Sequence, residues 1–233
     1  MVFQLDEEEI WFPDPRLGDD DGCIAVGGDL SVRRLLLAYS HGIFPWYSFR
    51  LSDPAWFCPM QRFVIFPEEI HVSHSMRTLM NKGRYKMSFN KDFEGVINGC
   101  SQCNNRIDDE RAWLGPEIIE AFTKLHELGF ASSVEVWDGE QLVGGLYGVT
   151  IKKVFIGESM FSRVPSASKL ALIYLATHLQ KFGNCLIDCQ LETPHLRSMG
   201  GRFIPYDEYM KWLKPKASET SEAPSPSLPE GRA

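Results

Sequence analysis

The sequence predicts an α+β fold in which a mainly antiparallel sheet is flanked by helices and preceded by a small N-terminal domain. Helix and strand patterns interleave from residue 62 onward. In the middle of the chain, three strand patterns follow one another with no helix between them, and Asp138-Gly139 after the first is typical of an antiparallel hairpin turn. These observations favour a meander over repeated parallel crossovers.

The first 61 residues are dense in Pro, Gly and aromatic side chains, and we expect them to form the small domain, residues 1–61. Ser31 is a preferred helix N-cap residue. The apolar-rich segment Val32–Ser40 after it predicts a helix that Gly42 ends. Residues 42–46 are predicted to be a loop.

Residues 62–213 are expected to form the second domain, and residues 214–233, rich in Pro, Ser and Glu, a disordered tail. Strands are predicted at residues 63–66, 85–89, 133–137, 142–149, 154–161 and 185–190. Helix starts are predicted at Ser73, Asn90, Gly115-Pro116 and Ser166 or Ser168, with stops at Gly83, Gly129 and Gly183. The helix after Gly115 should bury an apolar face made of Ile118, Ile119, Phe122, Leu125 and Leu128.

Composition excludes several classes of protein. With 44% hydrophobic residues the chain can bury a core, and it has no apolar run of about 18 residues, so no membrane span is expected. The acidic first ten residues lack the pattern of a targeting signal, which favours the cytosol. The six cysteines are too sparse for a disulfide scaffold, and the Cys100-Cys103 pair lacks the second ligand pair of a zinc ribbon, so no metal is expected.

Two predicted strands carry carboxylates among apolar residues. Alternation along a strand would place Asp188 and Gln190 on one face, and Glu158 and Met160 on one face of another strand. An ionised carboxylate is costly to bury without a partner, so Asp188 either meets a structural partner or serves a site. If the strands are neighbours, these side chains would surround a cavity.

Two further features favour nucleic acid. Trp46 and Trp113 lie beside Gly and Pro in predicted loops, where they would stack on bases or, alternatively, wedge the small domain onto the larger one. Residues 70–91 hold Arg77, Lys82 and Arg84 but no Asp or Glu. This basic stretch favours phosphate contacts over a merely solvated helix face.

Seven blocks of sequence resemble, in order, the motifs of the bacterial leucyl/phenylalanyl-tRNA–protein transferases. They are GGDL at 27–30, GIFPW at 42–46, HELG at 126–129, SVEVW at 133–137, GGLYG at 144–148, GESMFSR at 157–163 and LIDCQ at 186–190. The resemblance extends over residues 22–213. The glycine-rich block lies inside a predicted strand and so lacks the strand-to-helix context of a dinucleotide site.

The resemblance implies an aminoacyltransferase that moves Leu or Phe, with Met as a further candidate, from aminoacyl-tRNA to the α-amino group of proteins beginning with Arg or Lys. Such transfer marks the acceptor for degradation under the N-end rule. It also implies a GNAT-like second domain that uses no acetyl-CoA and no other cofactor. We expect a cytoplasmic monomer.

The resemblance also implies roles for individual residues. Trp46 and Trp113 would surround the terminal adenosine. The pocket for the transferred side chain would be lined by Leu146, Met160, Leu175, Leu179 and Ile187. Leu146 stands where many members have Met, and aromatic residues can occur at the positions of Leu175 and Leu179, so the preference between Leu and Phe stays open.

Asp188, Gln190 and Glu158 are the predicted catalytic residues, and Arg77, Lys82 and Arg84 the predicted tRNA contacts. Asp188, held or relayed by Gln190, would accept the proton of the attacking amine or only orient groups. Glu158 and Asp188 would also attract a cationic acceptor. Two other classes compete: an acyl-CoA N-acetyltransferase, which should show a glycine-rich loop at 163–168, and a non-enzymatic tRNA-binding protein, which would not need these inward polar side chains.

Overall fold

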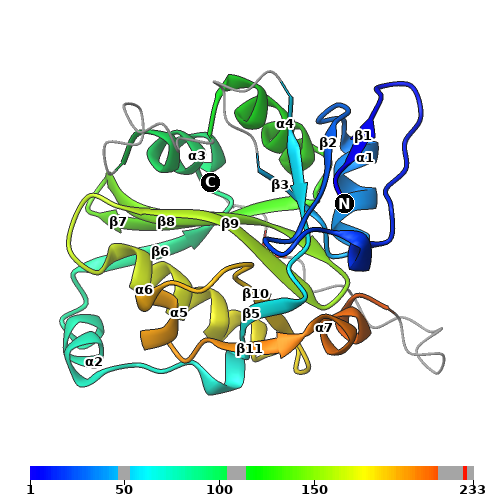
Figure 1. Cartoon of the computed structure of the whole chain (residues 1–233). Coiled ribbons are helices and arrows are strands. Elements are labelled where there is room, and N and C mark those ends of the chain that lie inside the picture. Colours follow the sequence, from blue (N-terminus) through cyan, green and yellow to red (C-terminus); the bar gives the residue numbers. More distant parts are fainter. Residues whose placement is uncertain (47–52, 104–113, 215–227, 230–233) are drawn as a thin grey trace.

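The computed structural model describes residues 1–46, 53–103, 114–214 and 228–229. The described elements form a sheet of four strands and a sheet of seven, with helices on both faces of the larger sheet (Figure 1). In this part of the chain no helix is long and apolar enough to cross a membrane. The predicted mixed α+β fold is confirmed.

The smaller sheet is built from the N-terminal residues. Its strands are β1 (Phe3–Leu5), β2 (Cys23–Gly27), β3 (Phe44–Trp46) and β4 (Ala55–Phe57), in the order β1-β2-β4-β3. Helix α1 (Val32–Ser40) connects β2 to β3, and the Ser31 hydroxyl accepts a hydrogen bond from Arg34 N, as the predicted cap requires. The predicted loop at 42–46 is wrong in part, because β3 pairs with β4 as an edge strand, where the missing N–H of Pro45 is tolerated.

The larger sheet holds the meander. Its strands are β5 (Gln61–Ile65), β6 (Tyr85–Phe89), β7 (Ala131–Asp138), β8 (Gln141–Ile151), β9 (Val154–Ser162), β10 (Leu186–Asp188) and β11 (Arg202–Pro205). They run in the order β11-β5-β10-β9-β8-β7-β6. Every neighbouring pair is antiparallel except β9 and β10, which are parallel. The sheet is therefore mainly antiparallel, as predicted.

Helices cover both faces of this sheet. Their bounds are α2 (His74–Asn81), α3 (Phe93–Gln102), α4 (Pro116–Glu127), α5 (Ala167–Leu179), α6 (Pro194–Ser198) and α7 (Tyr206–Leu213). Figure 1 shows α3 and α4 on one face and α5 and α6 on the other. Short 3₁₀ turns occur at Pro15–Leu17 and Pro67–Glu69. Two apolar clusters result, one joining the small sheet, α3, α4 and α7, and the other centred on α5.

The predicted starts of α2 and α4 are confirmed, whereas the predicted start of α3 is wrong by two residues. Ser73 caps α2 by accepting from Met76 N, and Pro116 opens α4. Asn90 is wrong as a cap, because its backbone is left-handed at φ 52° and its side chain accepts from Ser133 N. Asp92 caps α3 instead, through Gly95 N.

Helix α5 starts where predicted, because Ser166 is its N-cap residue and Ala167 its first helical residue. Ser166 itself is left-handed and makes no side-chain cap bond; Ser162 Oγ accepts from Ser168 N in its place. Two predicted boundaries differ from the structure. Leu128 lies beyond the end of α4 and is exposed rather than buried. Strand β10 ends at Asp188, two residues before the predicted end at Gln190.

The proposed division at residue 61 coincides with a change of sheet, since β4 ends at Phe57 and β5 begins at Gln61. One apolar cluster nevertheless joins the two units, with Ile24, Trp56 and Val64 among its fully buried members. The two-domain division, with its boundary at 61, thus stays a proposal. Within the predicted tail, Leu228 is buried against the cluster around α5.

A β-bulge between β8 and β9 yields a test of the sheet. Gly148 faces Gly157 across the pair, and a Cβ on Gly148 would lie 2.2 Å from Ile156 O, whereas one on Gly157 would meet only Asp188 O at 3.5 Å. We therefore expect Gly148→Ala to lower the free energy of unfolding by about 1–3 kcal/mol, the usual cost of overpacking. Gly157→Ala should stay within about 1 kcal/mol of wild type. Equal urea-unfolding midpoints for the two variants would contradict this account of the bulge.

Candidate active site

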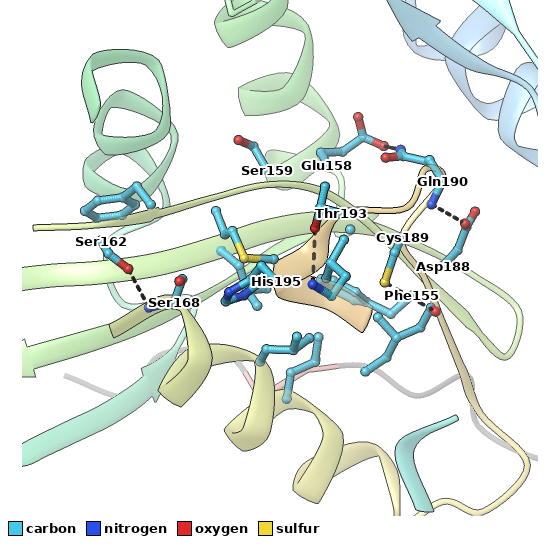
Figure 2. Close-up of a pocket in the computed structure, with 18 residues that line it drawn as sticks. Phe155, Glu158, Ser159, Ser162, Ser168, Asp188, Cys189, Gln190, Thr193 and His195 are labelled. Atoms are coloured by element: carbon cyan, nitrogen blue, oxygen red, sulfur yellow. Dashed lines mark hydrogen bonds between the residues drawn. The ribbon is translucent and has the colours of Figure 1, made fainter. Parts of the chain in front are cut away.

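A pocket of about 430 Å³ lies between the sheet and the helices α5 and α6 (Figure 2). Strands β9 and β10 supply one wall. Apolar side chains make up much of the lining: Leu146, Phe155, Met160, Leu172, Leu175, Ile187 and Leu196. Polar lining residues are Glu158, Ser159, Ser162, Ser168, Asp188, Gln190, Thr193 and His195. The pocket thus combines an apolar chamber with a polar edge.

Glu158 is placed by the bulge in β9. Gly157 pairs with Gly148 and Ser159 with Tyr147, which leaves Glu158 as the extra residue. The prediction that Glu158 and Met160 share one face of the strand is therefore wrong, because the extra residue shifts the alternation between them. The Glu158 carboxyl lies next to the Tyr39 hydroxyl of α1, while Met160 packs against the apolar cluster around α5.

Asp188 at the end of β10 is fully buried and fully paired. Arg62 Nε donates to Oδ1 at 2.9 Å and to Oδ2 at 3.0 Å, the Tyr209 hydroxyl donates to Oδ2 at 2.7 Å, and Gln190 N donates to Oδ1 at 2.8 Å. Burial opposes the charge of Arg62, but the charge of Asp188 outweighs it, so the pKa of the guanidinium is raised. Asp188 therefore has the structural partner that the sequence left open, at the edge of the pocket.

Gln190 lies two residues beyond the end of β10, and its side chain contacts Glu158. Its backbone is left-handed at φ 60°, so the predicted sharing of a strand face with Asp188 does not hold. Its Nε2 donates to Glu158 Oε1 at 3.1 Å, and Figure 2 shows the two side chains pointing toward one another. The structure thus brings together all three predicted catalytic residues, through contacts that strand alternation did not predict.

Glu158 is the carboxyl of this cluster whose pKa is shifted toward neutral pH. Burial, with a further contribution from the charge of Asp188, raises the pKa of Glu158 to about 8, against the opposing effects of Tyr39, Arg62 and Gln190. This carboxyl can therefore take up and release a proton close to neutral pH. That property is required of a general acid or base.

The predicted substrate-binding residues are distributed unevenly around the pocket. Leu146, Met160, Leu175 and Ile187 line it. Leu179 is buried in the same apolar cluster but is not among the lining residues. Trp46 ends β3, is 40% exposed and packs edge-on against Phe57, away from the pocket lining. Trp113 lies outside the described residues.

Sequence analysis missed several residues of the site. Arg62, Tyr39 and Tyr209 surround the carboxylates, and Thr193 and His195 line the pocket. Arg62 carried a signal, because a single charge next to the apolar run at 63–66 needs a buried partner. His195 Nε2 is buried and has no hydrogen-bond partner among the described residues, and burial, helped by Lys169, lowers the pKa of its imidazole.

The basic stretch lies apart from the pocket. Arg77 and Lys82 are exposed on α2 and at its C-terminal end. Arg84 forms an ion pair with Asp138 at 2.5 Å, so one of the three predicted phosphate contacts already has an acidic partner. Strand β6, which follows these residues, is the edge of the large sheet farthest from β11.

The cysteines form no recognisable metal site. All six are free thiols, and the described residues contain no group of three or more His, Cys, Asp or Glu side chains arranged to hold a metal ion. Cys189 lines the pocket, and burial raises the pKa of its thiol. A protonated thiol is a weak nucleophile.

Comparison with known proteins identifies the family. The family model described as "Leucyl/phenylalanyl-tRNA protein transferase" matches residues 64–214, and that of its N-terminal domain matches residues 28–60. The leucyl/phenylalanyl-tRNA–protein transferase of Flavobacterium psychrophilum is 50% identical over 208 residues, which are 89% of this chain and 97% of that protein. The proteins of the same name from Syntrophobacter fumaroxidans and Edwardsiella ictaluri are 46% and 43% identical, over 91% and 98% of this chain and 89% and 93% of their own length.

These relatives are all transferase enzymes by name, and their similarity extends over both sheets. The chain is thus a transferase by its relatives. The chain belongs to the leucyl/phenylalanyl-tRNA–protein transferase family, and the resemblance seen in its sequence motifs is confirmed.

The raised pKa of Glu158 yields a prediction about stability. Up to about pH 8 the native carboxyl keeps a proton that the unfolded chain releases near the ordinary Glu value of about 4.3. The free energy of unfolding of the wild type should therefore fall as pH rises between these values. Glu158→Gln removes this dependence, so its Tm relative to wild type should rise by several degrees from pH 5 to pH 8.

Glu192→Gln is the matched control, because Glu192 pairs with Arg197 at an exposed position. Its Tm relative to wild type should not rise over the same pH range. A Tm difference between Glu158→Gln and wild type that is the same at pH 5 and pH 8 would contradict the assignment of this titration to Glu158. Thermal unfolding followed by circular dichroism suffices for the measurement.

Proposed function

We propose that the chain transfers Leu or Phe, with Met as a further candidate, from aminoacyl-tRNA to the α-amino group of proteins with an N-terminal Arg or Lys. One observation carries the proposal beyond the family name. The apolar chamber of the pocket adjoins the hydrogen-bonded pair of Glu158 and Gln190. The apolar chamber suits the side chain of the transferred residue, and the polar pair suits the ester carbon that the amine attacks.

The apolar chamber would hold the side chain of the transferred residue. Leu146, Met160, Leu175 and Ile187 present only apolar atoms to it, and about 430 Å³ of space can accept a branched or aromatic side chain. Leu179 would act from behind this lining, through packing. Trp46 and Trp113 would stack on the terminal adenosine of the tRNA.

The reaction itself is the aminolysis of an ester. The neutral α-amine attacks the carbonyl carbon of the aminoacyl ester, a C–N bond forms, and the C–O bond to the ribose breaks. The amine loses one proton and the ribose oxygen gains one. We assign the accepting carboxyl to Glu158, because both Asp188 oxygens already accept hydrogen bonds, whereas the pKa of Glu158 is near 8.

Preference for Arg or Lys would come from the same carboxyl. The charge of Asp188 is already balanced by Arg62, so among the described residues Glu158 is the carboxyl of this cluster that forms no ion pair. A cationic side chain arriving beside it would favour its ionised form and gain a charge-assisted contact. A neutral side chain of the same shape would not.

The finer fold and the setting of the enzyme are also proposals. A GNAT-like assignment is supported by the meander from β6 to β9 and by the crossover through α5 to the parallel strand β10. A cytoplasmic location follows from the substrate, since aminoacyl-tRNA is made there. We propose that the enzyme works as a monomer, because the described residues of one chain provide both the apolar chamber and the polar pair.

A direct transfer assay tests the proposed function. Labelled Leu or Phe should pass from its tRNA to peptides beginning with Arg or Lys at least tenfold faster than to the same peptide beginning with citrulline, which keeps the shape of Arg without its charge. Glu158→Gln should lower kcat at least tenfold without changing aminoacyl-tRNA binding, while the exposed control Glu192→Gln should not. Equal rates with Arg and citrulline would refute charge-based selection, and no transfer at all would refute the function.

The basic stretch yields a separate prediction about tRNA. Changing Arg77, Lys82 and Arg84 together to Glu should weaken tRNA binding and reduce its salt dependence by about two ions, because Arg84 is already paired with Asp138. The matched control changes three exposed lysines elsewhere to Glu, namely Lys152, Lys181 and Lys214. If filter binding gives both triple variants the same log K against log salt slope, the basic stretch is only a solvated surface.

A further inference from the structure

Gln190 occupies a turn that few non-glycine residues adopt. Its φ is 60°, and Leu191 N donates to Cys189 O at 2.6 Å across it. A hydrogen bond from residue i+2 to residue i around a central residue with positive φ defines a rare and strained γ-turn. Such strain persists only where surrounding contacts impose it.

Contacts on both sides of Gln190 impose the turn. The backbone N of Gln190 donates to Asp188 Oδ1 at 2.8 Å. The neighbouring strand β5 adds two bonds, from Cys189 N to Phe63 O at 2.9 Å and from Phe63 N to Gln190 O at 3.4 Å. Within the described part of the chain, the side chain of Asp188 is thus the one side-chain acceptor among the contacts that hold this backbone.

The orientation of Asp188 depends in turn on two donors from distant parts of the chain. Arg62 of β5 donates through Nε to both carboxylate oxygens, and Tyr209 of α7 donates through its hydroxyl to Oδ2. The side chains of Arg62 and Asp188 are 1% and 0% exposed. When a carboxylate is buried this deeply, its orientation is set by its hydrogen-bond donors, because an unpaired buried charge is very unfavourable.

Aromatic packing fixes the two donors. The Arg62 guanidinium lies over the rings of Phe44 and Tyr209, at 4.9 and 4.7 Å from their centroids, and its Nη1 and Nη2 find no hydrogen-bond partner among the described residues. Gly42 lets the Tyr209 ring approach, since a Cβ there would lie 3.0 Å from it. Nε of Arg62 is therefore left pointing at Asp188.

We propose that Arg62 and Tyr209 are positioning residues, which act through Asp188 to hold the γ-turn that aims the Gln190 amide at Glu158. Neither side chain is among the described residues that line the pocket. The kinetic part of this inference rests on the proposed function, whereas the structural part does not. It makes helix α7, at the C-terminal end of the second domain, a component of the active site.

A pair of single-hydroxyl deletions on α7 tests the proposal. Tyr209→Phe removes the donor to Asp188 and keeps the ring over Arg62. Tyr206→Phe removes a comparable hydroxyl from the same helix, which donates to His41 O at 3.1 Å and does not reach the site. We expect Tyr209→Phe to lower kcat at least fivefold with the KM for aminoacyl-tRNA unchanged within twofold, and Tyr206→Phe to alter neither by more than twofold.

Amide hydrogen exchange gives a readout that needs no transfer activity. A peptide covering residues 189–191 should exchange at least tenfold faster in Tyr209→Phe than in wild type, and at the wild-type rate in Tyr206→Phe, because loosening of Asp188 frees the Gln190 and Leu191 amides. Exchange in β6 should be the same in all three proteins. If the Tyr209 hydroxyl only stabilised helix α7, the two variants would show the same exchange rate over residues 189–191.

The outcomes separate the two proposals. If wild type transfers neither Leu nor Phe, the proposed function fails, and exchange over 189–191 still decides whether Tyr209 holds the turn. If wild type is active, equal kcat values for the two variants, or equal exchange over 189–191, would overturn the positioning role. Arg62→Lys, which keeps the charge and displaces the donor, should lower kcat as well, and combined with Tyr209→Phe should lose less than the product of the two effects.

Discussion

The buried ion pair between Arg62 and Asp188 is the interaction on which the rest of the site depends. It joins strands β5 and β10 across 126 residues of sequence, and Tyr209 adds helix α7 to the same carboxylate. Removing either charge would leave the other buried without compensation, which is strongly destabilising. The two charges therefore have to stay together, which fixes the geometry of Asp188. Its position beside the pocket ties the packing of the C-terminal helix to the placement of Gln190.

Two local departures from regular geometry translate this anchor into a reactive site. The bulge at Glu158 turns that side chain toward Tyr39, and the γ-turn at Gln190 brings its amide to the same carboxyl. Without them, strand alternation would direct these side chains by parity alone. The polar pair thus lies at the polar edge of the pocket, while Met160 and its neighbours keep the chamber apolar.

The two acidic residues illustrate how environment divides labour between like side chains. Asp188 accepts hydrogen bonds from a guanidinium, a phenol and a backbone amide, so its orientation is fixed by three donors. Glu158 accepts from the neutral amide of Gln190, and its burial raises its pKa to about 8. One carboxylate is thus suited to positioning and the other to proton transfer. Pairs of carboxyl groups with contrasting surroundings are a recurring arrangement in enzyme sites.

The sequence by itself determined the elements whose signals are local. Ser31 and Ser73 cap helices through bonds to residues three positions away, strand β6 spans the predicted residues, and ordered motifs identified the family. Local signals were also wrong in one case. Asn is a residue type preferred at helix N-caps, but the side chain of Asn90 accepts its hydrogen bond from Ser133 N, which is distant in sequence. The site needed the tertiary structure. A bulge, a positive φ at a non-glycine residue and a buried ion pair are stable only when partners distant in sequence supply the compensating bonds, and period-two alternation carries no information about those partners.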